Sequence, residues 1–226
     1  MALIEMKKVT KRYPLGETTV TALHEIDFQI HKGDFMAVWG PSGSGKTSLL
    51  NLIGMIDLPS SGEVCLSGEK INDLSDDALS ELRNQKVGFI FQNFNLIPVL
   101  SALENVMLPL QIRGGDIKAA REKAIERLRE VGLGTLLSSR PDQMSGGQRQ
   151  RVAIARALIT DPDIVLADEP TANLDSETSF RIISLMRELN EKNHVTFVFS
   201  THDPRLLDHV NHKIKLVDGK IIKEKG

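Results

Sequence analysis

Residues 35–53 read FMAVWGPSGSGKTSLLNLI. The first five of these are apolar, as in a short strand that is covered on both faces. The next eight, Gly40-Pro41-Ser42-Gly43-Ser44-Gly45-Lys46-Thr47, match the phosphate-binding pattern G-x-x-x-x-G-K-[ST]. Residues 47–53 have the composition of a helix that leaves the loop. A glycine loop between a buried strand and a helix predicts a nucleotide-binding α/β domain.

The residue types in this loop fit triphosphate chemistry. Its glycines allow backbone N–H groups to converge on phosphate oxygens, and the following helix N-terminus adds a partial positive charge. Lys46 is expected to reach the β- and γ-phosphates, and the Thr47 hydroxyl is expected to be a ligand of Mg²⁺. Ser48, which follows directly, belongs to the same expected set of ATP contacts.

A second apolar run, residues 164–167, ends in the acidic pair Asp168-Glu169. A carboxylate at the C-terminal end of a parallel strand, beside a phosphate loop, lies where a magnesium ion needs a ligand. Asp168 fits that role. Glu169 is the candidate general base that accepts a proton from the attacking water. Alone, two acids after a strand are equally typical of an ordinary surface turn.

Three further polar features point to the same edge of the predicted sheet. Ser145-Gly146-Gly147-Gln148 precedes the amphipathic segment 149–159 and can form either a second anion site or an ordinary helix cap. Gln92 ends a buried run, and His202 follows another one. Because strand-terminal polar residues gather where α/β sheets bind ligands, we expect Gln92 to lie at this edge and His202 to contact the γ-phosphate there.

The distribution of apolar runs, helical spacing and turn signals predicts one domain over residues 1–226. Short apolar runs at 87–91, 164–167 and 195–199 are typical of a mostly parallel sheet flanked by helices. Helical spacing dominates between about 101 and 159, where Ser101 and Glu104 have the spacing of a capping box. Residues 214–217 and 220–222 flank Asp218-Gly219, a hairpin signal. We expect an ATP-binding core over about 1–94 and 160–226, with antiparallel β parts, and an inserted helical subdomain over about 95–159.

Charge and composition limit the kinds of partner that the chain is expected to bind. The net charge of −2 provides no basic footprint for nucleic acid. The single cysteine, Cys65, suits a reducing cytoplasm. The most apolar stretch, residues 96–112, is broken by Pro98 and Pro109 and contains polar residues, so no segment is expected to span a bilayer. The N-terminus lacks the apolar core of a signal peptide.

The order of these motifs resembles that of the ATPase subunit of ABC transporters, along essentially the whole chain. The phosphate loop resembles Walker A, residues 164–169 resemble Walker B, and Gln92 matches the Q-loop. Met144-Ser145-Gly146-Gly147-Gln148 resembles the signature sequence, with Met in place of the usual Leu. The D-loop is matched by Asn173-Leu174-Asp175, the switch histidine by His202, and the adenine-stacking aromatic by Tyr13.

This resemblance implies the ABC ATPase fold and a head-to-tail homodimer around two ATP molecules. Ser145, Gly146, Gly147, Gln148 and Asp175 of one copy would contact the ATP held by the other copy. Glu169, His202 and Gln92 would be catalytic, and Thr47, Gln92 and Asp168 would hold Mg²⁺. A small P-loop kinase would leave Ser145 to Gln148 and His202 without a role.

Segments 83–89, 101–106 and 168–175 resemble more narrowly the ATPases of lipoprotein-release and macrolide-export permeases. The expected function is therefore ATP hydrolysis that drives a stroke in an integral membrane permease, at the cytoplasmic face of the inner membrane and without direct membrane contact. The alternative is a cell-division regulator that transports nothing. Soluble ABC proteins of translation or DNA repair carry two cassettes or large insertions. The apolar segment 94–100 either contacts the permease or packs the helical subdomain.

Overall fold

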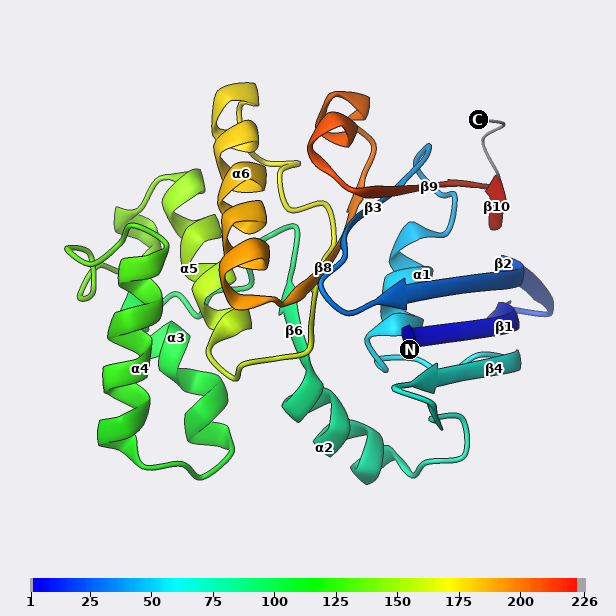
Figure 1. Cartoon of the computed structure of the whole chain (residues 1–226), viewed down its shortest axis with the longest axis horizontal. Coiled ribbons are helices and arrows are strands. Elements are labelled where there is room, and N and C mark those ends of the chain that lie inside the picture. The colour runs from blue at the N-terminus through cyan, green and yellow to red at the C-terminus, as the bar shows by residue number, and fades with distance from the viewer. Residues whose placement is uncertain (1, 223–226) are drawn as a thin grey trace.

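A computed structural model describes residues 2–222 and shows two sheets with helices packed around them (Figure 1). The strands are β1 (Ala2–Leu15), β2 (Thr18–His31), β3 (Phe35–Trp39), β4 (Ser61–Leu66), β5 (Glu69–Lys70), β6 (Val87–Ile90), β7 (Ile164–Ala167), β8 (Thr196–Thr201), β9 (His212–Val217) and β10 (Lys220–Ile222). The α-helices are α1 (Lys46–Ile53), α2 (Asp76–Lys86), α3 (Ala102–Ile112), α4 (Ile117–Glu130), α5 (Gly146–Leu158) and α6 (Ser176–Asn193).

The larger sheet has the strand order β10-β9-β3-β8-β7-β6 and is parallel except for the β9–β10 hairpin. Successive residues of β3 face opposite sides: Phe35 and Ala37 pack with the helical region, whereas Met36 and Val38 pack toward α1 and the smaller sheet. Both faces are therefore covered. This explains why these strands are continuous apolar runs without alternation.

The smaller sheet is antiparallel, with the order β2-β1-β4-β5. Its inward side chains form one hydrophobic core with α1 and one face of the parallel sheet; Val9, Ile26, Leu49 and Val198 are each almost fully buried there. The helix that follows the phosphate loop is thus packed between the two sheets. This packing fixes the start of α1 relative to β3.

Helices α3, α4 and α5 lie between β6 and β7 in the chain and gather at one end of the molecule, beside α6 (Figure 1). A capping box joins Ser101 and Glu104 at the start of α3, as the sequence predicts. Asn105, which is fully buried, accepts from the Ile97 N–H and donates to the carbonyl oxygens of Ile97, Leu100 and Ser101. Its amide therefore ties the segment before α3 to the helix.

The predicted hairpin at Asp218-Gly219 is confirmed, with both residues at positive φ as a two-residue turn of this kind requires. Residues 102–112 of the apolar stretch 96–112 form α3, which contains Pro109. Because proline has no backbone N–H, α3 lacks one of its helical hydrogen bonds at Pro109. Strand β8 also runs two residues beyond the expected 195–199. Among residues 2–222, no helix is long and apolar enough to cross a membrane.

Candidate active site

The phosphate loop connects the C-terminal end of β3 to α1 and is held tightly against its neighbours. Gly45 has φ 101°, and an added Cβ there would lie 2.5 Å from the carbonyl oxygen of Ala22. An added Cβ at Gly40 would overlap the carbonyl oxygen of Leu216. Only glycine fits at these two positions, because β2 and β9 approach the loop backbone directly. The two glycines therefore keep the loop compact, so its N–H groups can surround an anion.

Lys46 is the first residue of α1, and only 6% of its side chain is exposed. Its Nζ donates to the carbonyl oxygens of Gly40 at 3.1 Å and Pro41 at 2.9 Å. The same Nζ lies 3.9 Å from Glu169 Oε1. An ammonium has three protons, so two carbonyl oxygens of the loop can hold Lys46 while its charge also faces Glu169.

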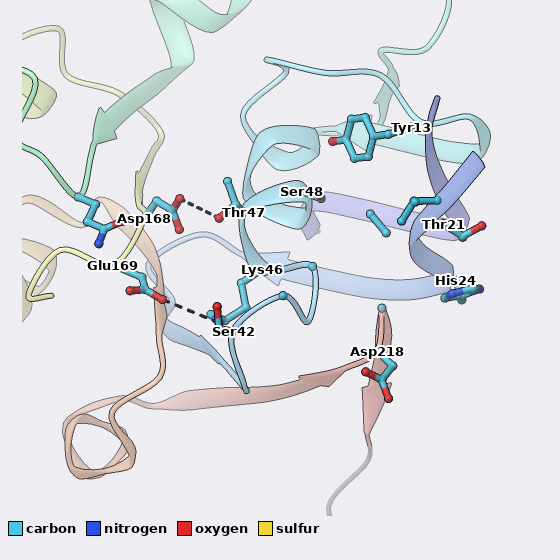
Figure 2. A pocket seen from close by; sticks show the side chains of 16 residues that line it. Tyr13, Thr21, His24, Ser42, Lys46, Thr47, Ser48, Asp168, Glu169 and Asp218 are labelled. Atoms are coloured by element: carbon cyan, nitrogen blue, oxygen red, sulfur yellow. Dashed lines mark hydrogen bonds and ion pairs between the residues drawn. The ribbon is translucent and has the colours of Figure 1, made fainter. Parts of the chain in front are cut away.

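The two acidic residues after β7 meet the phosphate loop as the sequence predicts (Figure 2). The Thr47 hydroxyl donates to Asp168 Oδ2 at 2.9 Å, across 121 positions of the chain. Ser200, on β8, donates to Asp168 Oδ1 at 2.6 Å and accepts from the Glu169 N–H at 2.8 Å. Parallel strand order places β8 beside both β3 and β7, which is why these three groups converge.

Glu169 and His202 face each other at the same edge. The distance between Glu169 Oε2 and His202 Nδ1 is 3.2 Å, and the histidine side chain is 60% exposed. Glu169 also has φ 45°, an uncommon backbone conformation for a residue with a side chain. This conformation, together with the contacts to Lys46 and His202, holds the carboxylate at the edge where Lys46 and Asp168 also lie.

The loop lines a cleft of about 690 Å³. Many of the predicted residues line this cleft, namely Tyr13, Ser42, Gly43, Gly45, Lys46, Thr47, Ser48, Gln92, Asp168 and Glu169. Sequence reasoning missed others that the fold brings to it from β2 and the β9–β10 turn: Val20, Thr21, Ala22, His24, Asp218 and Gly219. Asp218-Gly219 carried a turn signal only, and the β2 residues carry no motif at all. Gly40, Pro41 and Ser44 belong to the loop without lining the cleft.

Tyr13 lines the cleft, and contacts with Asp57 and Lys11 hold its side chain in place. Its hydroxyl donates to Asp57 Oδ2 at 3.0 Å, and the Lys11 ammonium lies 4.9 Å from the centre of its ring. Burial raises the pKa of the Tyr13 hydroxyl. Burial also raises the pKa of Asp57, but hydrogen bonds from Lys11 and Tyr13 outweigh this and the net pKa is lowered. Asp57 is therefore ionised at neutral pH and anchors the aromatic ring.

The second glycine motif begins α5 and does not line this cleft. Ser145 caps the helix: its Oγ accepts from the Gln148 N–H at 3.3 Å, and the Gln148 side chain accepts from the Ser145 N–H at 2.8 Å. An added Cβ on Gly147 would lie 2.7 Å from Thr178 of α6. Asp175 caps α6 and accepts from the Thr178 N–H and hydroxyl, which lowers the pKa of its carboxyl. These residues form a separate surface where two helices begin.

Similarity to known proteins agrees with this geometry. Residues 23–172 match the family model of the ABC transporter, a span that includes the phosphate loop, Gln92, the second glycine motif and Asp168-Glu169. The chain belongs to the ABC transporter family. It is an ATP-binding cassette of that family, and its reaction is ATP hydrolysis.

Its relatives include a lipoprotein-releasing system ATP-binding protein LolD of Anaeromyxobacter dehalogenans, 46% identical over 97% of this chain and 92% of the relative. The ABC transporter ATP-binding protein MJ0796 of Methanocaldococcus jannaschii is 46% identical over 98% of this chain and 96% of the relative. The macrolide export protein MacB of Syntrophobacter fumaroxidans is 47% identical over the whole chain, which spans only 32% of that ATP-binding/permease protein.

Solved structures agree with the fold of this ABC cassette. Two dimeric structures of the MJ0796 cassette have a TM-score of 0.89 and cover 98% of this chain and 97% of theirs. One of them, 46% identical, is a post-hydrolysis state bound to ADP and Pi. The predicted ABC ATPase fold is therefore confirmed, with its parallel sheet, antiparallel sheet and inserted helices.

The cleft of this cassette has the donor set that a phosphate-bound magnesium ion needs. Among residues 2–222 there is no group of three or more His, Cys, Asp or Glu side chains placed to hold a metal by themselves. Mg²⁺ in nucleotide sites instead takes one or two protein ligands together with phosphate oxygens and water. The Thr47 hydroxyl and the Asp168 carboxylate, 2.9 Å apart, fit this smaller requirement.

Proposed function

We propose that this ABC cassette hydrolyses ATP in the cleft between the phosphate loop and the Asp168-Glu169 pair, with Glu169 as the general base. The observation that carries this assignment is the convergence of Lys46, Glu169 and His202, with 3.9 Å and 3.2 Å between the neighbouring charged or titratable groups. In this arrangement Lys46 and the loop N–H groups stabilise negative charge on the phosphates while Glu169 accepts the proton of the attacking water.

His202 and Gln92 complete the proposed catalytic set. His202 contacts Glu169 directly, so it can orient the carboxylate, and its exposed ring can contact the γ-phosphate. Gln92 lines the same cleft, and its backbone carbonyl accepts from the Asn173 side chain at 2.9 Å. We assign Thr47, Asp168 and Gln92 to a magnesium ion that neutralises phosphate charge during the reaction. We assign Tyr13 to the adenine ring, and residues 40–48 to the phosphates.

We further propose that two copies associate head to tail, so that Ser145, Gly146, Gly147, Gln148 and Asp175 of one copy contact the ATP of the other. The separate surface formed by these residues supports this, because Ser145 before α5 is exposed and none of these residues lines the nucleotide cleft. The dimeric structures of the related MJ0796 cassette support it as well. Hydrolysis would then require nucleotide-dependent closure of the dimer.

The membrane partner is proposed from the relatives. LolD is named for lipoprotein release, and MacB joins its ATP-binding part to a permease. We propose that this cassette, too, drives an integral membrane permease, from the cytoplasmic face of the inner membrane, and does not bind nucleic acid. Residues 94–100 of the segment after Gln92 would contact that permease; Val99 is 72% exposed there. These relatives favour a release or export system over a cell-division regulator.

The test is the substitution Glu169→Gln, which keeps the shape of the side chain and removes the base. Loss of a general base typically lowers kcat by about 10²–10⁴-fold. We expect that loss with unchanged ATP affinity, and we expect the variant to accumulate as a dimer in ATP on size-exclusion chromatography. Turnover within a few-fold of the unmodified chain would exclude Glu169 as the base. A Glu177→Gln variant, changed at an exposed residue of α6, is the control.

A further inference from the structure

Ser200 connects the two acidic residues of the cleft, although it lies outside the nucleotide motifs. It is the fifth residue of β8 and is fully buried. Its hydroxyl donates to Asp168 Oδ1 at 2.6 Å and accepts from the backbone N–H of Glu169 at 2.8 Å. One buried hydroxyl therefore contacts the proposed metal ligand and the backbone of the proposed base at the same time.

The contact to Asp168 determines how its carboxylate is oriented. Ser200 holds Oδ1 and the Thr47 hydroxyl holds Oδ2, so both carboxylate oxygens have a defined partner. If Thr47 turned its oxygen toward a metal ion, Ser200 would still hold the carboxylate plane. A hydrogen bond from a neighbouring group to a ligating carboxylate is a recognised means of orienting a metal ligand.

The contact to Glu169 replaces a backbone hydrogen bond at the point where the sheet ends. The parallel β7–β8 pairing stops at Ala167 opposite Phe199. Beyond it, Glu169 adopts φ 45° and its N–H donates to the Ser200 side chain instead of a strand carbonyl. An uncommon backbone conformation persists only where surrounding contacts hold it. The Ser200 hydroxyl supplies such a contact and so helps to set the direction of the Glu169 carboxylate.

We propose that Ser200 is a positioning residue for ATP hydrolysis, acting through Asp168 on the metal and through Glu169 on the attacking water. This inference rests on the proposed roles of Asp168 and Glu169. Ser200 acts through these two residues, and its removal should change the chemical step and metal affinity while ATP binding through the phosphate loop is retained.

A purely structural role would predict something different, and the same strand offers a matched control. Thr196, at the start of β8, is also fully buried, and its hydroxyl accepts from the Gly33 N–H at 3.0 Å. Thr196→Val removes a buried hydroxyl that satisfies a backbone N–H, away from the cleft. Ser200→Ala makes the corresponding change beside Asp168 and Glu169. Both variants are expected to unfold at a lower temperature than the unmodified chain.

The experiment compares these two variants with the unmodified 226-residue chain in three measurements. Steady-state ATPase assays give kcat and KM, thermal unfolding gives the loss of stability, and electron paramagnetic resonance of free Mn²⁺ gives metal affinity of the ADP-loaded protein. For Ser200→Ala we expect roughly 10–100-fold lower kcat and weaker Mn²⁺ binding, the usual effect of losing such a partner, with KM for ATP within about two-fold. Thr196→Val should keep kcat and Mn²⁺ affinity.

Three results would each overturn the proposal: kcat of Ser200→Ala within about three-fold of the unmodified chain, unchanged Mn²⁺ affinity, or an equal loss of kcat in Thr196→Val. These results are distinguishable from failure of the proposed function. If the unmodified chain and Glu169→Gln hydrolyse ATP equally, the role of Glu169 fails first. If only Glu169→Gln is inactive and Ser200→Ala is normal, the role of Ser200 alone fails.

Discussion

Replacing Lys46 with methionine should weaken ATP binding while leaving the fold intact. Methionine keeps the length of the buried stem but removes the ammonium, whose protein partners are two neutral carbonyl oxygens and Glu169 at 3.9 Å. One unit charge on a phosphate about 4 Å from Nζ is worth about 4 kcal/mol at an effective dielectric constant of about 20. The desolvation of both partners offsets part of this, so we expect a net loss of about 2–3 kcal/mol, or roughly 30–150-fold in Kd.

The assay is a calorimetric titration with ATP, ADP and AMP in EDTA, which prevents hydrolysis. Since Lys46 is assigned to the β- and γ-phosphates, AMP affinity should change by no more than about two-fold. Lys32→Met is the control, because Lys32 is an exposed lysine whose ammonium lies 3.9 Å from Asp163. An ATP affinity within three-fold of the unmodified chain, or an equal loss for AMP and ATP, would refute the assignment of Lys46.

The remaining predictions concern stability and assembly. Burial raises the pKa of the Glu130 carboxyl, but hydrogen bonds from Lys192 and Arg127 outweigh burial, and the net pKa is lowered from 4.5. The ionised carboxylate therefore stabilises the fold above about pH 4.5, and this contribution is lost as the pH falls through the lowered pKa of Glu130. Glu130→Gln should flatten that part of a plot of Tm against pH. A slope equal to that of the unmodified chain would contradict this prediction. Ser145→Arg should abolish turnover while the monomer still binds ATP. Ser145→Ala is the control for the loss of the helix cap, which typically lowers stability by about 1 kcal/mol. Normal hydrolysis by the arginine variant would exclude a nucleotide site shared between two copies.

Local chemistry made part of the site predictable from the sequence. The loop from Gly40 to Thr47 needs glycines and a lysine at fixed spacing because phosphate is bound by backbone N–H groups and one charge. The acids after β7 were predictable because strand ends in α/β sheets collect ligands. In both cases the relevant residues are neighbours in the chain, so the spacing alone carries the information.

Other residues of the site could be found only in the folded chain. Val20, Thr21 and His24 line the cleft because β2 is packed over the start of α1. No local sequence pattern in β2 predicts this contact.

The sequence by itself predicted the chemistry: a phosphate-loop pattern, two carboxylates and a histidine in a fixed order along the chain. Tertiary structure decided how these groups are oriented. Asp168 and Glu169 take their geometry from Ser200, 32 and 31 positions away, because parallel pairing places β8 beside β7. Hydrogen bonds between distant segments depend on strand order and register, and these are set by the packing of both faces of the sheet rather than by any local run of residues.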